Sequence, residues 1–99
     1  MKLIDMADAV AAAQQLLNEH PGLPAPLFEI DAYRVTVRLH GGFGDFEAWR
    51  EALDLDDNEI SLTAYLGGAN LTAVTDIKGV PVTVMGYSSS LPQTAEAAA

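Results

Sequence analysis

The last third of the chain, residues 59–87, alternates apolar and polar side chains almost without interruption. A period of two is typical of β-strands that bury one face of a sheet. Two short turns, Gly67-Gly68 and Lys78-Gly79, divide this stretch into three strands, and two-residue turns of this kind join antiparallel neighbours. The sequence therefore predicts a three-stranded antiparallel meander.

The positions of the two turns also predict the register of the meander. The first turn places Leu62 opposite Ala73, and the second places Ala73 opposite Val84, so these three residues share one row across the sheet. Turn spacing and alternation agree on which face is apolar. We expect this row to lie in the core, covered by Trp49 and Leu17.

Two more strands precede the meander, on either side of a short turn at Asp31-Ala32. With that turn, Glu29 faces Arg34, which puts an opposite-charge pair on the polar side of the hairpin. In the last strand, Pro81 has no backbone N–H group to donate, and this favours an edge position for that strand.

Two helices complete the predicted fold, at about 5–19 and 45–54, with Asp5 and Asp45 as the expected N-caps. The sequence predicts an α+β, two-layer sandwich of order α-β-β-α-β-β-β, with two helices on one face of a mostly antiparallel five-stranded sheet. Residues 1–88 form a single domain in this prediction, and residues 89–99 form a disordered tail. The apolar stripe expected on the first helix consists of Met6, Val10, Ala13 and Leu17, with Ala9 and Leu16 beside them.

The charge balance argues against several classes of partner. The 99 residues include 14 Asp or Glu and five Lys or Arg, for a formal net charge of −9. Nucleic-acid binding depends on clustered Lys and Arg, and anionic membrane surfaces attract the same residues, so we expect neither as a direct partner. With no cysteine, the chain has no thiolate nucleophile and no Cys-ligated metal. Because no apolar run is long enough for a membrane helix, we expect a soluble cytoplasmic protein without a cofactor.

Three local patterns resemble functional motifs but lack essential residues. The glycine segment at 42–47 has no Gly-Lys-Ser/Thr, and it places Asp45 and Glu47 where a phosphate would sit. The run Gly86-Tyr87-Ser88 is not followed by the second glycine of a hydrolase nucleophile elbow. The loop at 54–58 is not continued by the glycine and glutamate of a calcium loop. We therefore predict that the protein is not an enzyme and binds no metal.

The remaining candidate is the face of the sheet that the helices leave open. Alternation places on it two of the three arginines, together with tyrosine, methionine and histidine. Arg and Tyr recur at binding hot spots, although an ordinary solvated sheet face also alternates polar residues. The candidate interaction surface consists of Arg34, Thr36, Arg38, His40, Tyr65, Met85 and Tyr87.

Two segments, residues 11–24 (AAAQQLLNEHPGLP) and 46–53 (FEAWREAL), occur in an Ala-rich and acidic chain. In these features the chain resembles small proteins of high-GC actinomycetes and their phages or plasmids. The resemblance covers about the first half of the chain. It implies a cytoplasmic accessory protein and carries over no known activity and no site residue.

Three functional hypotheses follow from these observations. The first is a non-catalytic module that binds a protein partner or a second copy of itself, as a homodimer, through the open face or an edge of the sheet. The second is an acidic inhibitor or immunity protein that mimics nucleic acid and blocks a basic cleft. The third is a small-ligand binder or an enzyme with a pocket between helices and sheet, although the residues form no catalytic constellation.

Overall fold

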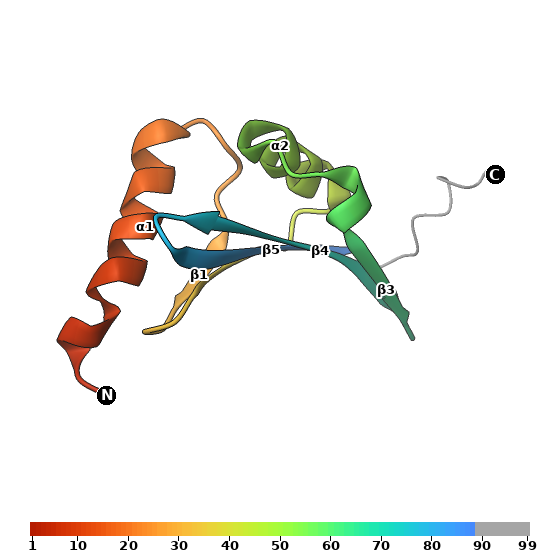
Figure 1. Ribbon diagram of the computed structural model, residues 1–99. Coiled ribbons are helices and arrows are strands. Elements are labelled where there is room, and N and C mark those ends of the chain that lie inside the picture. Colours follow the sequence, from red (N-terminus) through yellow and green to blue (C-terminus); the bar gives the residue numbers. More distant parts are fainter. Residues whose placement is uncertain (89–99) are drawn as a thin grey trace.

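The computed structural model describes residues 1–88, so the tail expected at 89–99 lies outside the described residues. Two helices lie on one side of a five-stranded sheet (Figure 1), in the predicted order α-β-β-α-β-β-β. The strands lie side by side in the order β1-β2-β5-β4-β3, and only β2 and β5 are parallel. The elements are α1 (Ala7–Glu19), β1 (Leu27–Ile30), β2 (Val35–Leu39), α2 (Phe43–Leu53), β3 (Ser61–Tyr65), β4 (Gly68–Ile77) and β5 (Val80–Ser88).

The first helix turns a different face to the sheet than predicted. α1 buries Ala9, Ala12 and Leu16, whereas Val10 and Leu17 remain 48% and 57% exposed. Both sets recur at helical spacing, so this alanine-rich helix carries two apolar stripes. The sheet takes the side that holds Ala9 and Leu16, and Ala13 of the predicted stripe also packs against the core, whereas Val10 and Leu17 face solvent.

The start of this helix also differs from the prediction. A short 3-10 helix, Leu3–Met6, precedes α1, and its first turn holds the expected cap Asp5. The Asp5 carboxylate accepts a hydrogen bond from the Lys2 backbone N–H at 2.8 Å. Asp5 therefore stabilises the 3-10 helix and does not cap α1.

The β1–β2 hairpin has a four-residue connection where a two-residue turn was predicted. Ile30 pairs with Val35, and Asp31 Oδ1 accepts hydrogen bonds from the backbone N–H groups of Tyr33 (2.7 Å) and Arg34 (2.9 Å). Asp side chains commonly stabilise turns in this way. The turn takes Tyr33 and Arg34 out of the strand, so the pairs expected across Asp31-Ala32 do not form.

The N-cap of the second helix lies three residues earlier than predicted. Gly42 is its N-cap, with φ of +102°, and Asp45 lies in its first turn rather than at the cap. A positive φ favours glycine, so the glycine-rich segment serves to turn the chain from β2 into α2. An acidic residue in the first turn is favourable beside the helix dipole.

α2 packs on the sheet through two aromatic residues. Phe46 lies directly over Gly86 of β5, where a Cβ atom would come within 2.6 Å of the Phe46 Cβ. Trp49 is 3% exposed and packs edge-on against Phe28 of β1, with ring centroids 6.4 Å apart. Its Nε1–H donates a hydrogen bond to the Pro24 carbonyl at 2.9 Å. Trp49 therefore fixes the proline-rich connection between α1 and β1 against the core.

The β4–β5 hairpin has the predicted register, with Ala73 opposite Val84. Lys78 and Gly79 both have positive φ, at 52° and 85°, as a type I′ turn requires. The β3–β4 register differs from the prediction by two residues, because Leu62 pairs with Leu71 and not with Ala73.

The cause of this shift is the position of the first turn. The turn residues are Leu66 and Gly67, and Gly67 has φ of +91°. Gly68 belongs to β4, where the backbone carbonyl of Ser88 and the Tyr65 ring leave no room for a side chain. Sequence alone could not distinguish which of two adjacent glycines would turn the chain.

The prediction of an edge position for the proline-containing strand is wrong, since β5 is the central strand of the sheet. Pro81 is the second residue of β5, and pairing with β2 begins only at Val82. The hairpin register directs the backbone nitrogen of Pro81 away from β4. The missing N–H group therefore removes no hydrogen bond from either ladder.

The predicted core row is only partly confirmed. Ala73 and Val84 are buried under the helices, together with the valines of β2 and Val82. Leu62 is 54% exposed, because β3 lies at the edge of the sheet beyond the cover of α2 (Figure 1). Trp49 lies in the core, but Leu17 does not.

Candidate functional site

The open face of the sheet and its end at His40 bring together six of the seven predicted surface residues, all except Arg34. Thr36, Arg38, Met85 and Tyr87 lie on β2 and β5, in adjacent rows of the parallel pair. Their positions agree with the alternation, but Thr36 is only 9% exposed, because neighbouring strands flank it on both sides. Arg34 lies in the β1–β2 turn, so it does not form a basic stripe with Arg38 as expected.

Arg38 is the centre of a polar network that we call the Arg38 cluster, formed with Glu29, Met85 and Tyr87. The Arg38 Nε lies 2.9 Å from Glu29 Oε1, and its Nη1 donates hydrogen bonds to the Tyr87 hydroxyl and to Met85 Sδ, the latter at 3.7 Å. The Tyr87 hydroxyl lies 3.5 Å from the same sulfur. Contact with the Glu29 carboxylate, and more weakly with Tyr87, raises the pKa of Arg38 above its ordinary value.

This cluster makes Arg38 a structural residue of the sheet. Its guanidinium is neutralised by a carboxylate on the neighbouring strand β1, where the sequence predicted a pair between Glu29 and Arg34. The pair is partly exposed, and such pairs contribute only about 0–1 kcal/mol to stability. The other side-chain hydrogen bonds of Arg38 go to its own sheet, so Arg38 offers little free charge to a partner.

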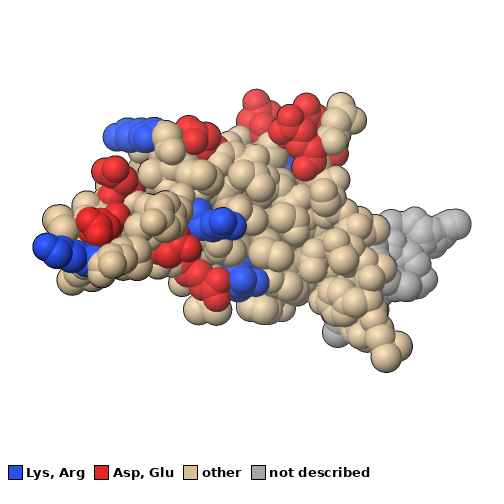
Figure 2. All heavy atoms as spheres, turned by 60° about the horizontal axis from the view of Figure 1, so that its bottom comes forward, with Lys and Arg blue, Asp and Glu red and all other residues tan. Residues whose placement is uncertain are grey.

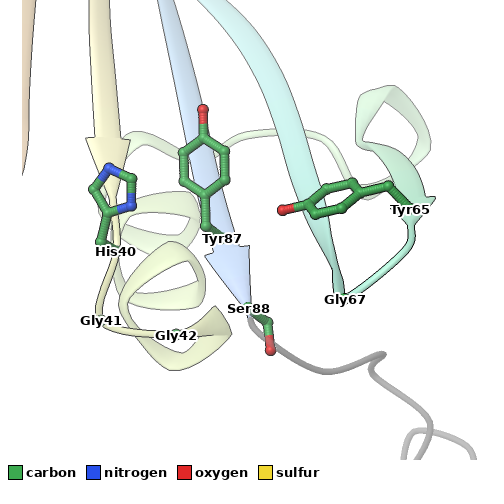
Figure 3. A pocket seen from close by; sticks show the side chains of 7 residues that line it. All are labelled: His40, Gly41, Gly42, Tyr65, Gly67, Tyr87 and Ser88. Carbon is green, nitrogen blue, oxygen red and sulfur yellow. The ribbon is translucent and has the colours of Figure 1, made fainter.

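A shallow hollow of about 660 Å³ lies beside this cluster, at the ends of β2 and β5. His40 and Tyr87 stack in parallel there, with ring centroids 4.7 Å apart, and Tyr65 reaches toward them from the end of β3 (Figure 3). Its lining supplies one imidazole, two phenols and a serine hydroxyl, with three glycines. The Tyr65 hydroxyl already donates a hydrogen bond to the Ala69 carbonyl at 3.4 Å. The lining contains no carboxylate, and His40 is its side chain of the kind that most often serves as an acid or a base.

The second candidate is the outer side of β3, which we call the β3 edge. All five residues of Ser61–Tyr65 are exposed, and within residues 1–88 no strand pairs with their outer side. The strand contains no charged residue and no proline. Leu66, at the adjoining turn, is fully exposed. Natural proteins usually protect a free edge with charge, proline or extreme shortness.

The opposite edge of the sheet has these protections. β1 is four residues long, directly follows Pro26, and carries Glu29 in its centre. Within residues 1–88 the two edges of the sheet therefore differ, because the β3 edge has neither the charge nor the preceding proline of the β1 edge.

The register shows which backbone groups the β3 edge presents. Even-numbered residues of β4 direct their backbone groups toward β3, because the odd-numbered ones bond to β5 across the two-residue turn. Ser61, Thr63 and Tyr65 face these residues and exchange hydrogen bonds with β4. Leu62 and Ala64 consequently direct their N–H and C=O groups outward.

Acidic residues do not form one continuous surface on the open face. Figure 2 shows Asp and Glu in separate groups, with Lys and Arg among those near α1 and with an uncharged projecting end at the side of β3. The strongest ionic contacts of α2 are also internal, since Arg50 binds Glu47 and lies 3.4 Å from Asp57. The hypothesis of an acidic inhibitor stays a prediction that no particular contact favours.

Comparison of the chain with known protein families, curated proteins and solved structures gave no match. In the part of the chain that the structure describes, no three His, Asp or Glu side chains lie close enough together to hold a metal ion. The same residues contain no helix that is long and apolar enough to cross a membrane.

Sequence reasoning did not identify β3 as the exposed edge strand of the sheet. The alternation predicted the strand and its hydrogen-bonding neighbour β4, but the order of strands in a sheet is a long-range property. One signal was available, because the run from residue 60 to residue 75, which includes all of β3, contains no charged residue.

Proposed function

We propose that this protein is a non-catalytic interaction module that binds a second copy of itself along the β3 edge, in the cytoplasm. The observation that carries the proposal is an edge strand exposed along its whole length, with outward backbone groups at Leu62 and Ala64 and no charge or proline. Addition of a strand to such an edge is a common mode of protein recognition.

The distribution of charge favours an antiparallel arrangement of the two β3 strands. Residues 54–59, which precede β3, include four carboxylates, whereas the turn that follows β3 has none. Antiparallel pairing about Thr63 places each acidic segment beside the uncharged turn of the other copy. Parallel pairing would place the two acidic segments side by side, and like charges in contact are unfavourable.

This pairing also explains the apolar residues at the edge. When the two β3 strands pair with Thr63 at the centre, Leu62 lies opposite Ala64 of the second copy. Opposite residues point to the same face, so the two sheets form one continuous sheet with all helices on the same side. Leu62 is 54% exposed in a single chain, and a neighbouring strand would cover it. A closed two-fold dimer would leave neither β3 edge free.

A proline at Ala64 tests the proposal. Ala64→Pro removes an outward N–H group without removing a donor from the β3–β4 ladder. Each copy loses one intermolecular hydrogen bond, worth about 0.5–1.5 kcal/mol, and the ring hinders approach. We expect the dissociation constant of the dimer to rise at least about tenfold, measured by light scattering across a concentration series.

Two controls distinguish the β3 edge from the open face as the interface. Ala64→Thr keeps the N–H group and should retain the dimer, while circular dichroism verifies that both Ala64 variants are folded. Arg34→Ser combined with Arg38→Ser removes the arginine of the β1–β2 turn and the arginine of the open face, and should also retain the dimer. Loss of the dimer in this double variant, with the Ala64→Pro protein still dimeric, would place the interface on the open face instead.

A further inference from the structure

The hollow at the ends of β2 and β5 is lined by three aromatic rings that come from different parts of the sheet (Figure 3). His40 covers one face of Tyr87, since the two rings are within 8° of parallel and their centroids are 4.7 Å apart. Tyr65 lies on the other side of Tyr87, and its hydroxyl points toward that ring. The hollow therefore opens between two tyrosines, one of which has an uncovered ring face.

Both phenol hydroxyls of the hollow already have partners within the chain. The Tyr87 hydroxyl accepts a hydrogen bond from Arg38, and the Tyr65 hydroxyl donates one to the Ala69 carbonyl. These bonds hold the two side chains in position and leave their ring faces to a ligand. The face of an aromatic ring is electron-rich, so it attracts a positive charge.

Small residues around the rings keep the hollow open. A Cβ atom added at Gly42 or at Gly67 would meet nothing within 4 Å, and both glycines belong to the lining. The Tyr65 side chain is 46% exposed, so its ring is accessible from solvent. The volume of about 660 Å³ lies within the range of small-molecule sites.

The charges around the hollow disfavour an anion. The lining contains no Lys or Arg, and the Asp45 carboxylate lies against Gly41, where an added Cβ would collide with Asp45 Oδ2. Arg38, which contacts Tyr87, is paired with Glu29 at 2.9 Å. The whole chain carries a formal charge of −9, and such a field concentrates cations around the protein.

Among cations, an alkylated ammonium group fits this lining better than a metal ion or a primary amine. Within residues 1–88, no cluster of His, Asp and Glu is close enough to hold a metal ion. A primary ammonium is strongly hydrated and needs hydrogen-bond acceptors. A quaternary ammonium has no N–H group to satisfy, and its methyl groups pack on aromatic faces.

We propose that this hollow binds a quaternary ammonium group, whose methyl groups contact the rings of Tyr65 and Tyr87. Free choline-like molecules and trimethylated lysine side chains both present this group. The site is formed within one chain, so it does not depend on pairing at the β3 edge.

Titration with choline tests the site in the full chain, at constant ionic strength, with the ring-proton resonances as the signal. We expect saturable shifts at His40, Tyr65 and Tyr87. The matched probe is the neutral alcohol that has a tert-butyl group in place of the trimethylammonium group of choline. Because it lacks the charge, it should bind at least about fivefold more weakly.

Substitutions at Tyr65 separate the ring from the hydroxyl. Tyr65→Leu removes a ring and should weaken choline binding by about two- to fivefold, whereas Tyr65→Phe keeps the ring and should change it by less than about twofold. The control Tyr33→Leu removes a tyrosine that is 76% exposed in the β1–β2 turn and should bind choline as wild type does. Circular dichroism verifies that each variant is folded.

Comparison of choline with the acetylated amide of trimethyl-lysine distinguishes the two sources of the group. Tighter binding of choline indicates a small molecule, and tighter binding of the amino-acid derivative indicates a modified protein. Either result supports the site, since both probes carry the same cation.

Three outcomes would overturn the inference. The first is equal binding of choline and its neutral analogue, and the second is an equal effect of Tyr65→Leu and Tyr33→Leu. The third is the absence of saturable shifts at the three rings, with changes spread over the acidic residues instead. Choline binding by a strictly monomeric protein would refute pairing at the β3 edge and leave this site intact, and a dimer without choline binding would do the reverse.

Discussion

Single residues determine how closely the two layers approach. Gly86 lies in the central strand, directly under Phe46, so the absence of a side chain there lets α2 rest on β5. Arg38 lies on the opposite, open face, where its contacts with Glu29 and Tyr87 connect β2 to β1 and β5. In both cases the chemistry of one residue serves packing within the chain.

The packing at Gly86 leads to a prediction about stability. Gly86→Ala would bring a methyl group within 2.6 Å of the Phe46 Cβ, and overpacking of this kind typically costs about 1–3 kcal/mol. The control Gly44→Ala lies in α2 with nothing within 4 Å of the added atom. Since alanine favours a helix over glycine by up to about 1 kcal/mol, Gly44→Ala should not lower stability in urea denaturation. Equal effects of the two substitutions would contradict the described packing of α2.

At the scale of elements, α1 is a helix with two apolar sides that serve different purposes. Ala9, Ala12 and Leu16 pack on the sheet, whereas Val10 and Leu17 face solvent. The helix is attached by two alanines and Leu16, while Val10 and Leu17 on another side remain exposed.

Adjacent leucines of α1 distinguish these two sides experimentally. Leu16 is 2% exposed, so Leu16→Ala should lower the free energy of unfolding by about 2–5 kcal/mol. Leu17→Ala removes the same atoms from a side chain that is 57% exposed, and we expect a loss of less than about 1 kcal/mol. Chemical denaturation of both variants at a concentration where the protein is monomeric measures the difference. A larger loss for Leu17→Ala would mean that α1 is rotated.

The sequence predicted the helices and strands of this fold better than the order in which the strands lie side by side. Periodicity is a local property, so both helices, all five strands and the β4–β5 register followed from it. The β3–β4 register differs from the prediction because either of two adjacent glycines could form the turn. The β1–β2 register differs because the Asp31 side chain stabilises a longer connection than the predicted two-residue turn. The central place of β5 depends on a parallel pairing with β2 that no local pattern encodes.

The candidate surfaces illustrate the same limit. Alternation placed Arg38, Met85 and Tyr87 correctly on the open face, because the side of a strand follows from its period. It could not reveal that Arg38 would be neutralised by Glu29, since that contact depends on the hairpin register. The exposed stripe of α1 was recognised as apolar but assigned to the core.

At the scale of the whole molecule, the sheet has one protected end and one open end. Pro26, Glu29 and shortness protect β1, whereas β3 is uncharged and exposed along its length. A free edge of this kind promotes uncontrolled aggregation unless it is paired. We therefore regard pairing of two β3 edges as the arrangement that best explains the sequence of this strand.

Amide hydrogen exchange at β3 is the measurement that tests this claim most directly. Thr63 donates its N–H to β4, so its amide should be protected at every protein concentration. The amides of Leu62 and Ala64 point outward and should exchange quickly in dilute protein. If two copies pair through β3, the protection of Leu62 and Ala64 rises with concentration together with the dimer mass. Rapid exchange at both residues in fully dimeric protein, or a strict monomer at all concentrations, would contradict the account.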